Sequence, residues 1–260
     1  MPLVHLISNK VTMADTVNAI LAAGGRGICG DNISEVEEVN AISDALLLNI
    51  GTPHERTLYT MLKAGRFANK RGIPVVLDPV GVGVSRFRVE IIREILDKVK
   101  ITCIRGNGNE ICTLCNLFNV GTGLEDDYTM LTDDKSPYEP IKALAGILNT
   151  IVISTGGTDY VTDGVREQFI TGGSEYCDKI TGFGCMLSGV IAKDLAAGKD
   201  LAVGKDLNIS DFEKICRTLR LYKKAAEDAE FQMQIINFAG PGAFKCLFMD
   251  KLYEYFYKQA

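Results

Sequence analysis

The 260-residue sequence contains no tryptophan and only two histidines, His5 and His54. This scarcity argues against a Ser-His-Asp hydrolase and against a histidine-bound zinc enzyme, because both place histidine at the reacting centre. No apolar run approaches the roughly 20 residues that a membrane-spanning helix needs. The first residues, Met1 to His5, lack the basic-then-apolar pattern of a signal peptide. The net charge of −5 gives no electrostatic reason to expect nucleic acid or an anionic membrane as partner. We therefore expect a cytoplasmic protein.

The sequence holds eight cysteines, which are scattered along the chain. In a cytoplasmic protein most of them are expected to be reduced and buried as small apolar side chains. Cys112 and Cys115 have the CxxC spacing that is found in redox and zinc sites. Because there is no second CxxC and histidine is scarce, zinc binding at this pair has little support. A thiol-redox role for the pair is kept as an alternative hypothesis.

Short apolar runs alternate with amphipathic segments along most of the chain. Such runs are typical of strands covered on both faces, and each strand–helix–strand unit implies parallel pairing through a right-handed crossover. Asp163-Gly164 between two short runs predicts a hairpin, and the polar residues 119–138 predict a long loop. We expect strands at residues 3–7, 45–50, 73–79, 101–104 and 151–154, the two runs of the hairpin at 160–164 and 168–170, and helices at 12–23, 34–42, 55–71, 87–100, 138–148, 185–197, 210–232 and 241–257, with one further helix that begins at Glu110.

No repeat, linker or low-complexity tract interrupts this alternation. We therefore predict a single α/β domain over residues 1–260, with a central, mostly parallel sheet flanked by helices on both faces. The second of the expected helices should begin with a capping box, because Ser34 is followed three positions later by Glu37.

Polar and charged residues follow the apolar runs at the points where the strands should end. The carboxyl ends of parallel strands share one edge of a sheet, where ligands bind in doubly wound folds. Asp78 and Glu110 offer hard oxygen ligands that suit Mg²⁺. Arg105 can hold a phosphate by two hydrogen bonds, and Thr155 offers a hydroxyl to another phosphate oxygen. Strand-end turns of this composition also occur in α/β proteins without such a function.

The stretch Gly182-Phe183-Gly184-Cys185 precedes an apolar, proline-free segment and is expected at a helix N-terminus. Unpaired N–H groups and the helix dipole favour an anion there, and they also favour the thiolate of a nearby cysteine. The turn is therefore either a phosphate cradle with a reactive cysteine or a glycine turn before a buried helix with an inert cysteine. Together with the strand-end residues it would supply what phosphoryl transfer requires. The sequence lacks the GxxxxGK[ST] loop, which excludes a P-loop enzyme.

The order of these motifs resembles that of the hydroxyethylthiazole kinase family. The resemblance runs from Pro2 almost to the C-terminus, and it is carried by Asn49-Ile50-Gly51-Thr52, Leu77 to Gly83, Ile104 to Glu110, Asp159 to Gly164, Thr181 to Cys185 and Gly240 to Phe244. It implies a ribokinase-like fold and the phosphorylation, by ATP and Mg²⁺, of the hydroxyl of 4-methyl-5-(2-hydroxyethyl)thiazole in thiamine biosynthesis or salvage. It also implies a homotrimer with active sites at the subunit interfaces.

The resemblance also implies roles for individual residues. Arg105 and Thr155 match the nucleotide-binding arginine and threonine of the family. Asp78 and Glu110 match its acidic, magnesium-associated positions. Gly182 matches a glycine that contacts the substrate in the anion-binding turn.

Two cysteines match further positions of the family. Cys185 stands where this family has cysteine and where the wider superfamily has an aspartate general base, so the resemblance implies a catalytic role. Cys29 replaces a methionine that touches the thiazole, and Arg26 adds a charge beside it. Phe183 stands where the family prefers a small residue. Alternatives are a kinase of a related small alcohol such as hydroxymethylpyrimidine, or a non-catalytic ligand sensor on the same fold.

Overall fold

The computed structural model describes residues 1–120, 138–196, 209–235, 237 and 240–257. Its centre is one eight-stranded sheet with the strand order β2-β1-β3-β4-β5-β6-β7-β8. The pairs from β2 to β6 are parallel, whereas β7 pairs antiparallel with both of its neighbours. The strands are β1 (Leu3–Ile7), β2 (Arg26–Cys29), β3 (Ala45–Asn49), β4 (Val75–Asp78), β5 (Cys103–Asn107), β6 (Ile151–Thr155), β7 (Asp159–Thr162) and β8 (Glu167–Ile170).

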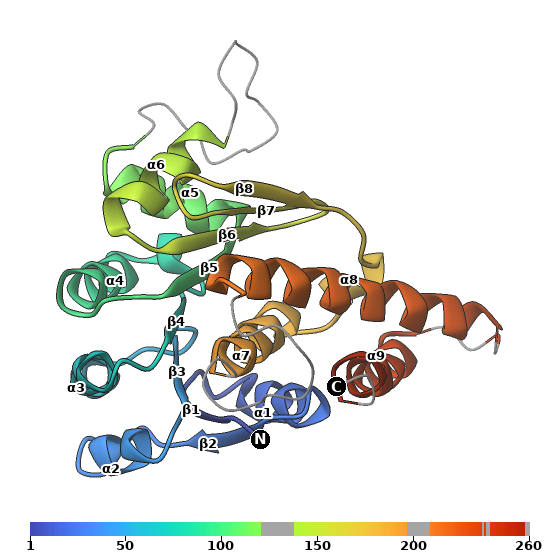
Figure 1. Ribbon diagram of the computed structural model, residues 1–260, viewed down its shortest axis with the longest axis horizontal. Coiled ribbons are helices and arrows are strands. Elements are labelled where there is room, and N and C mark those ends of the chain that lie inside the picture. The colour runs from blue at the N-terminus through green and yellow to red at the C-terminus, as the bar shows by residue number, and fades with distance from the viewer. Residues whose placement is uncertain (121–137, 197–208, 236, 238–239, 258–260) are drawn as a thin grey trace.

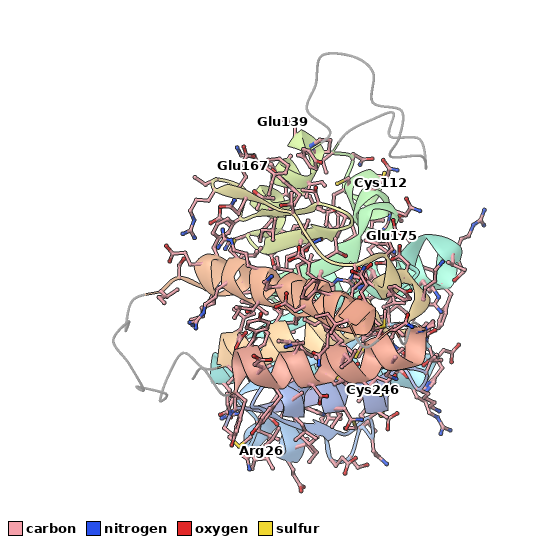
Figure 2. All side chains as sticks on the ribbon, turned by 90° about the vertical axis from the view of Figure 1, so that its right-hand side faces the viewer. Arg26, Cys112, Glu139, Glu167, Glu175 and Cys246 are labelled. Carbon is pink, nitrogen blue, oxygen red and sulfur yellow. The ribbon has the colours of Figure 1, made fainter. Side chains whose placement is uncertain are left out.

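Helices cover both faces of the sheet (Figure 1). One face carries α1 (Met13–Ala22), α7 (Phe183–Ala196), α8 (Asp211–Ile235) and α9 (Pro241–Phe256). The other carries α2 (Val36–Ala41), α3 (Glu55–Arg71), α4 (Arg86–Lys98), α5 (Gly108–Leu117) and α6 (Glu139–Leu148). Two short 3₁₀ turns, η1 (Val82–Val84) and η2 (Glu175–Lys179), lie between these elements. Figure 2 shows α8 and α9 side by side at the surface.

The apolar runs divide their side chains between two cores. Leu47 and Val76 face the core that α1, α7, α8 and α9 complete, and Leu46, Leu48 and Leu77 face the core on the opposite side. All five side chains are fully buried. Alternation across a strand covered on both faces explains why these runs are apolar throughout. The predicted α/β architecture with a mostly parallel sheet is confirmed.

Several expected elements are confirmed with close boundaries. Helix α3 spans Glu55–Arg71 and ends at Gly72, whose φ of 67° is the left-handed conformation that glycine adopts without strain. The hairpin of β7 and β8 turns at Asp163-Gly164 as predicted. Most of the loop predicted at 119–138 lies outside the described residues.

Two expectations about the N-terminal third need correction. Strand β2 was not among the predicted strands, because Arg26-Gly27-Ile28-Cys29 has little apolar character and forms only the edge of the sheet. The capping box predicted at Ser34 is wrong, since α2 begins at Val36 after Glu35 without a side-chain cap. The backbone N–H of Ser34 instead donates to Oδ1 of Asn32, 3.0 Å away, in a local turn.

None of the helices in the described ranges is long and apolar enough to cross a bilayer.

Candidate active site

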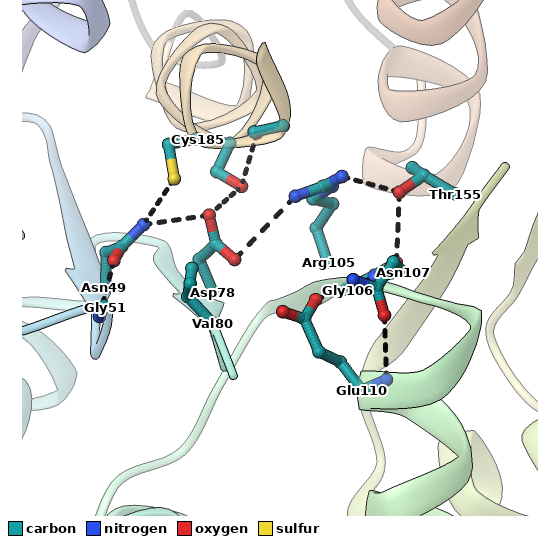
Figure 3. A network of polar contacts seen from close by, with 12 residues as sticks. Asn49, Gly51, Asp78, Val80, Arg105, Gly106, Asn107, Glu110, Thr155 and Cys185 are labelled. Atoms are coloured by element: carbon teal, nitrogen blue, oxygen red, sulfur yellow. Dashed lines mark hydrogen bonds and ion pairs between the residues drawn. The ribbon is translucent and has the colours of Figure 1, made fainter. Parts of the chain in front are cut away.

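Five residues from separate parts of the sequence meet at the carboxyl edge of the sheet (Figure 3). Asn49 and Asp78 are paired across β3 and β4, and Asn107 and Thr155 are paired across β5 and β6. The first turn of α7 brings Cys185 over the same edge. The parallel order of these strands is what gathers the polar residues that follow each apolar run.

Asp78 is the most buried charged residue of this cluster, with no exposed surface. Its Oδ2 accepts hydrogen bonds from Nδ2 of Asn49 at 3.0 Å and from the hydroxyl of Ser188 on α7 at 2.9 Å. Its Oδ1 has no hydrogen-bond partner among the described residues and lies 3.8 Å from Nη1 of Arg105. Burial raises the pKa of Asp78 to about 6, and the charge of Arg105 opposes this shift.

Arg105 and Thr155 form a second part of the cluster. Nη2 of Arg105 donates to Oγ1 of Thr155 at 2.6 Å, and this hydroxyl donates to the carbonyl of Gly106 at 3.1 Å. The guanidinium lies so close to α7 that a Cβ atom at Gly184 would overlap it. Glycine at this position therefore allows Arg105 to approach the N-terminus of α7, where an anion is favoured.

Glu110 lies in the first turn of α5 and is held by backbone groups on two sides. Its Oε1 accepts from the N–H of Gly81 at 2.8 Å, and its Oε2 accepts from the N–H of Asn107, also at 2.8 Å. Oδ1 of Asn107 accepts from the N–H of Glu110 at 2.9 Å, which completes a capping box. Figure 3 shows the Glu110 carboxylate directed toward the space shared by Asp78 and Arg105.

The two carboxylates fit a magnesium ion. Oδ1 of Asp78 is a buried, orphaned oxygen, which an ion or its bound water would satisfy. The charge of Glu110 raises the pKa of Asp78, so the two carboxylates lie within electrostatic reach of each other. No group of three or more His, Cys, Asp or Glu side chains converges on one point within the described ranges. Mg²⁺ usually takes only one or two carboxylates, with water and phosphate oxygens completing its shell.

Cys185 is 6% exposed and is contacted by two side-chain amides. Nδ2 of Asn49 lies 3.2 Å from its Sγ, and Nδ2 of Asn9 lies 3.6 Å away. Burial raises the pKa of the Cys185 thiol, and the neighbouring charge of Asp78 raises it further. The thiol is therefore protonated at neutral pH.

Asn9 is a site residue that the sequence did not single out. Besides approaching Cys185, its Nδ2 donates to Oδ1 of Asn49 at 2.9 Å. Its own Oδ1 accepts from the N–H of Val11 at 3.1 Å and from both the N–H and the hydroxyl of Thr12 at 3.0 Å. Asn9 thus fixes the amide orientation of Asn49 and the start of α1. It stands two residues after β1, and Asn49 is the last residue of β3, so this strand-end position could have pointed to it.

The turn before α7 is confirmed as a glycine turn at a helix N-terminus. Gly182 has a φ of +82°, and a Cβ atom there would overlap the side chain of Thr12. The N–H of Phe183 donates to the carbonyl of Ile180 at 3.3 Å, and the N–H of Met186 donates to that of Gly182 at 2.8 Å. The first-turn N–H groups of a helix have no acceptor within it, so this end can hold an anion.

The remaining cysteines of interest lie apart from this cluster. Cys29 ends the edge strand β2 and is exposed, and β1 separates β2 from β3 with its Asn49. Cys112 and Cys115 lie buried in α5, and burial raises the pKa of Cys115 to about 12. Such a thiol reacts slowly, which disfavours the redox alternative.

Comparison with known proteins gives consistent results for sequence and structure. A sequence profile of the hydroxyethylthiazole kinase family matches residues 1–258. A hydroxyethylthiazole kinase of Lysinibacillus sphaericus is 39% identical over 232 residues, which cover 87% of this chain and 83% of that protein. The solved structure of the Pyrococcus horikoshii hydroxyethylthiazole kinase superposes with a TM-score of 0.82 at 32% identity, covering 97% of this chain and 88% of that one.

A more distant structure shows the same fold. A ribokinase-like superfamily protein from Enterococcus faecalis superposes with a TM-score of 0.66 at 12% identity, covering 97% of this chain and 87% of that one. The sheet flanked on both faces by helices is therefore a ribokinase-like fold, as the sequence predicted.

Proposed function

Because the chain belongs to the hydroxyethylthiazole kinase family, we propose that it transfers the γ-phosphoryl group of ATP to the hydroxyl of 4-methyl-5-(2-hydroxyethyl)thiazole. The reaction is a step of thiamine biosynthesis or salvage and uses ATP as co-substrate. The observation that supports it most directly is the meeting of Asp78, Arg105, Thr155 and Cys185 at one sheet edge beneath the N-terminus of α7. A cation, carboxylates and backbone donors are what phosphoryl transfer requires.

Arg105 and Thr155 bind the nucleotide phosphates in this proposal. Their side chains already contact each other at 2.6 Å, so a phosphate would find the guanidinium and the hydroxyl in one place. The N–H groups of Gly182, Gly184 and Cys185, in the turn at residues 182–185, stabilise the charge that develops on the phosphoryl group during transfer, whereas the N–H of Phe183 already donates to Ile180. Glycine at position 182 leaves room for Thr12, and glycine at position 184 lets the Arg105 guanidinium reach the same turn.

Asp78 and Glu110 hold magnesium in this proposal. Asp78 contributes its orphaned Oδ1, and Glu110 contributes the lone pairs that its two backbone N–H donors leave free. Magnesium bound there neutralises the negative charge of the phosphates. The chain's own part is to fix both carboxylates before the nucleotide arrives: Asn49 and Ser188 orient Asp78, and the capping box orients Glu110.

The acceptor alcohol lies beside Cys185 and Gly182 in this proposal. The amides of Asn49 and Asn9 converge on Cys185 Sγ, so they favour the thiolate form, which is the form that can accept the proton of the acceptor hydroxyl and become the thiol. The loose transition state of phosphoryl transfer reduces how strong this base has to be.

Cys29 contacts the thiazole ring in this proposal, and it does so from a neighbouring copy of the chain. It is exposed at the end of the edge strand β2, away from Cys185 in the strand order. A homotrimer with sites at its subunit interfaces would bring the two together. Native mass spectrometry should then give three copies per particle. We place the protein in the cytoplasm, where ATP is supplied.

A coupled ADP-release assay tests the function. We expect ADP release that depends on hydroxyethylthiazole and that falls to background when Arg105 is changed to Met. Hydroxymethylpyrimidine serves as the comparison alcohol, and turnover with it alone would favour the rival kinase. Calorimetry that finds tight binding of ATP or thiazole, together with no phosphate transfer to either alcohol, would favour a sensor.

A further inference from the structure

Lys223 on α8 has its charged end inside the protein, although it looks in the sequence like half of a solvated Lys-Lys pair. The residue is 9% exposed. Its Nζ donates to three carbonyl oxygens: that of Gly156 at 3.0 Å, that of Gly157 at 3.2 Å and that of Gly172 at 3.1 Å. Lysine has three N–H donors, and four acceptors lie within 3.2 Å of Nζ, because Oδ1 of Asp159 is as near as these carbonyls.

The charge of Lys223 is balanced by Asp159, the first residue of β7. Nζ lies 3.2 Å from Oδ1 of Asp159, and the same Oδ1 accepts from the N–H of Gly156 at 3.0 Å. Burial raises the pKa of Asp159, and the charge of Lys223 is the strongest influence in the opposite direction. A buried ion pair is weak evidence for stability, because desolvation offsets most of its attraction. The position of the pair calls for another explanation.

The carbonyls that Lys223 holds belong to two glycine pairs. Gly156 and Gly157 directly follow Thr155, and Gly172 and Gly173 follow β8 with φ values of +108° and +103°. Glycine pairs have no side chains to pack, and glycine loses more conformational freedom on ordering than any other residue. Any order in these segments has to come from bonds to their backbone.

The outer side of the first glycine pair is open. A Cβ atom added at Gly157 would meet no described atom within 4 Å, and one at Gly156 would meet only the carbonyl of Thr158 at 3.7 Å. Lys223 therefore holds this loop from its inner side and leaves its outer side accessible. Glu227, one turn further along α8, supports the second pair by accepting from the N–H of Gly173 at 3.3 Å.

We infer that Lys223 is a positioning residue for the nucleotide phosphates, which it serves by holding the Thr155-Gly156-Gly157 backbone through the carbonyls of both glycines. This inference rests on the proposed function, because it takes the nucleotide to lie at Thr155. Without Lys223, the loop that follows Thr155 would lose the hydrogen bonds that join its two glycine carbonyls to α8.

The test compares Lys223→Met with Lys224→Met. Methionine keeps the apolar stem and removes the charge and all three donors. Lys224 is the matched control, because it is exposed and pairs with Asp228 at the surface at 2.8 Å. We expect Lys223→Met to raise KM for ATP and the calorimetric Kd for MgATP about tenfold or more, the usual scale for lost charged hydrogen bonds. The KM for thiazole should change less than about threefold, and Lys224→Met should resemble the unchanged protein.

Lys223→Met leaves Asp159 buried and unpaired, so a loss of folding has to be separated from a loss of positioning. The double variant Lys223→Met/Asp159→Asn removes both charges, and thermal melting shows whether it is folded. We expect it to melt higher than Lys223→Met and still to bind MgATP about tenfold more weakly than the unchanged protein. Unchanged ATP affinity in the folded double variant would overturn the inference and leave Lys223 as a partner of Asp159 alone.

The inference and the proposed function fail in different ways. If the unchanged protein shows no thiazole-dependent ADP release and no MgATP binding, the proposed function fails first. If the unchanged protein binds and turns over ATP while both variants at position 223 match it, only the role of Lys223 is wrong.

Discussion

Gly182 is the residue on which the turn before α7 depends most strongly. Its φ of +82° disfavours any other residue, and a side chain there would overlap Thr12, whose hydroxyl and N–H are both bonded to Asn9. We expect Gly182→Val to displace the turn and to lower kcat by about 10²-fold or more, the scale seen when one donor to a developing oxyanion is lost. The rate of ADP release at saturating substrate measures this change in kcat.

A glycine-to-valine substitution away from the site controls for the general effect of adding a valine side chain. Gly146 on α6 has open space around its Cβ position among the described residues, so Gly146→Val should leave kcat unchanged. If Gly182→Val is folded by thermal melting and keeps full kcat, the turn does not hold the transferring group.

Cys185 is predicted to be a weak base in its present form. Burial and Asp78 raise the pKa of its thiol, so the thiolate fraction is small at pH 7 and increases as the pH rises toward the pKa. We expect kcat to increase from pH 7 to pH 9.

In Cys185→Asp the amides of Asn49 and Asn9 would donate to a carboxylate instead. We therefore expect this variant to keep or raise kcat at pH 7, with a flatter pH profile. A folded but inactive Cys185→Asp would show that the site requires sulfur.

At the scale of elements, Phe183 joins the start of α7 to α8, α9 and η2. Its ring centroid lies 4.6 Å from that of Phe248 and 5.0 Å from that of Tyr222, and Phe244 stacks on Tyr176 in the same group. The Tyr222 hydroxyl donates to the carbonyl of Phe183 at 2.7 Å. This packing explains a bulky residue in a turn that otherwise needs small ones, and no sequence pattern indicated it.

We expect Phe183→Thr to reduce stability more than activity. Losing a partly buried aromatic side chain should cost about 2–3 kcal/mol of the free energy of unfolding, which lowers Tm by about 4–12 °C in a protein of this size. The bond from Tyr222 goes to the backbone of residue 183 and remains, so kcat should change only a few-fold. Phe231, on α8 and 62% exposed, provides the control Phe231→Thr, which should shift Tm little. Equal Tm values for the two variants would contradict this account.

Elements were predictable where local chemistry and tertiary packing agree. The amphipathic period and the closing Gly72 define α3, and the fully buried run Ala45–Asn49 defines β3. Strand β2 could not be predicted, because it is ordered by pairing with β1 and not by its own residues. For α5 the local pattern was present but was not used. Asn107 and Glu110 form a capping box that starts the helix at Gly108, two residues before the predicted start at Glu110.

At the scale of the whole molecule, the site follows from the sheet topology. Asp78, Arg105 and Thr155 were predictable as site residues because each follows an apolar run, and parallel pairing places such ends together. Ser188 and Lys223 lie within helices, where no local pattern separates a residue that faces the site from one that faces the core. Their roles depend on how α7 and α8 pack across the sheet, and this packing could not be predicted from the sequence.

Binding of MgATP should stabilise the whole molecule, because a ligand that binds only the native state shifts unfolding by mass action. At a concentration 100 times its Kd the gain is about 2.7 kcal/mol, which corresponds to a rise in Tm of about 5–10 °C. We expect ATP with EDTA to give a smaller rise than ATP with Mg²⁺. In Asp78→Asn this difference should become clearly smaller, because the orphaned Oδ1 is an oxygen assigned to the ion and only Glu110 would remain as a carboxylate ligand. Asp250→Asn, at an exposed site on α9, should keep the difference. Since each variant is compared with itself, any change in its own stability cancels, and a magnesium-dependent rise in Asp78→Asn as large as that of the unchanged protein would exclude Asp78 as a ligand.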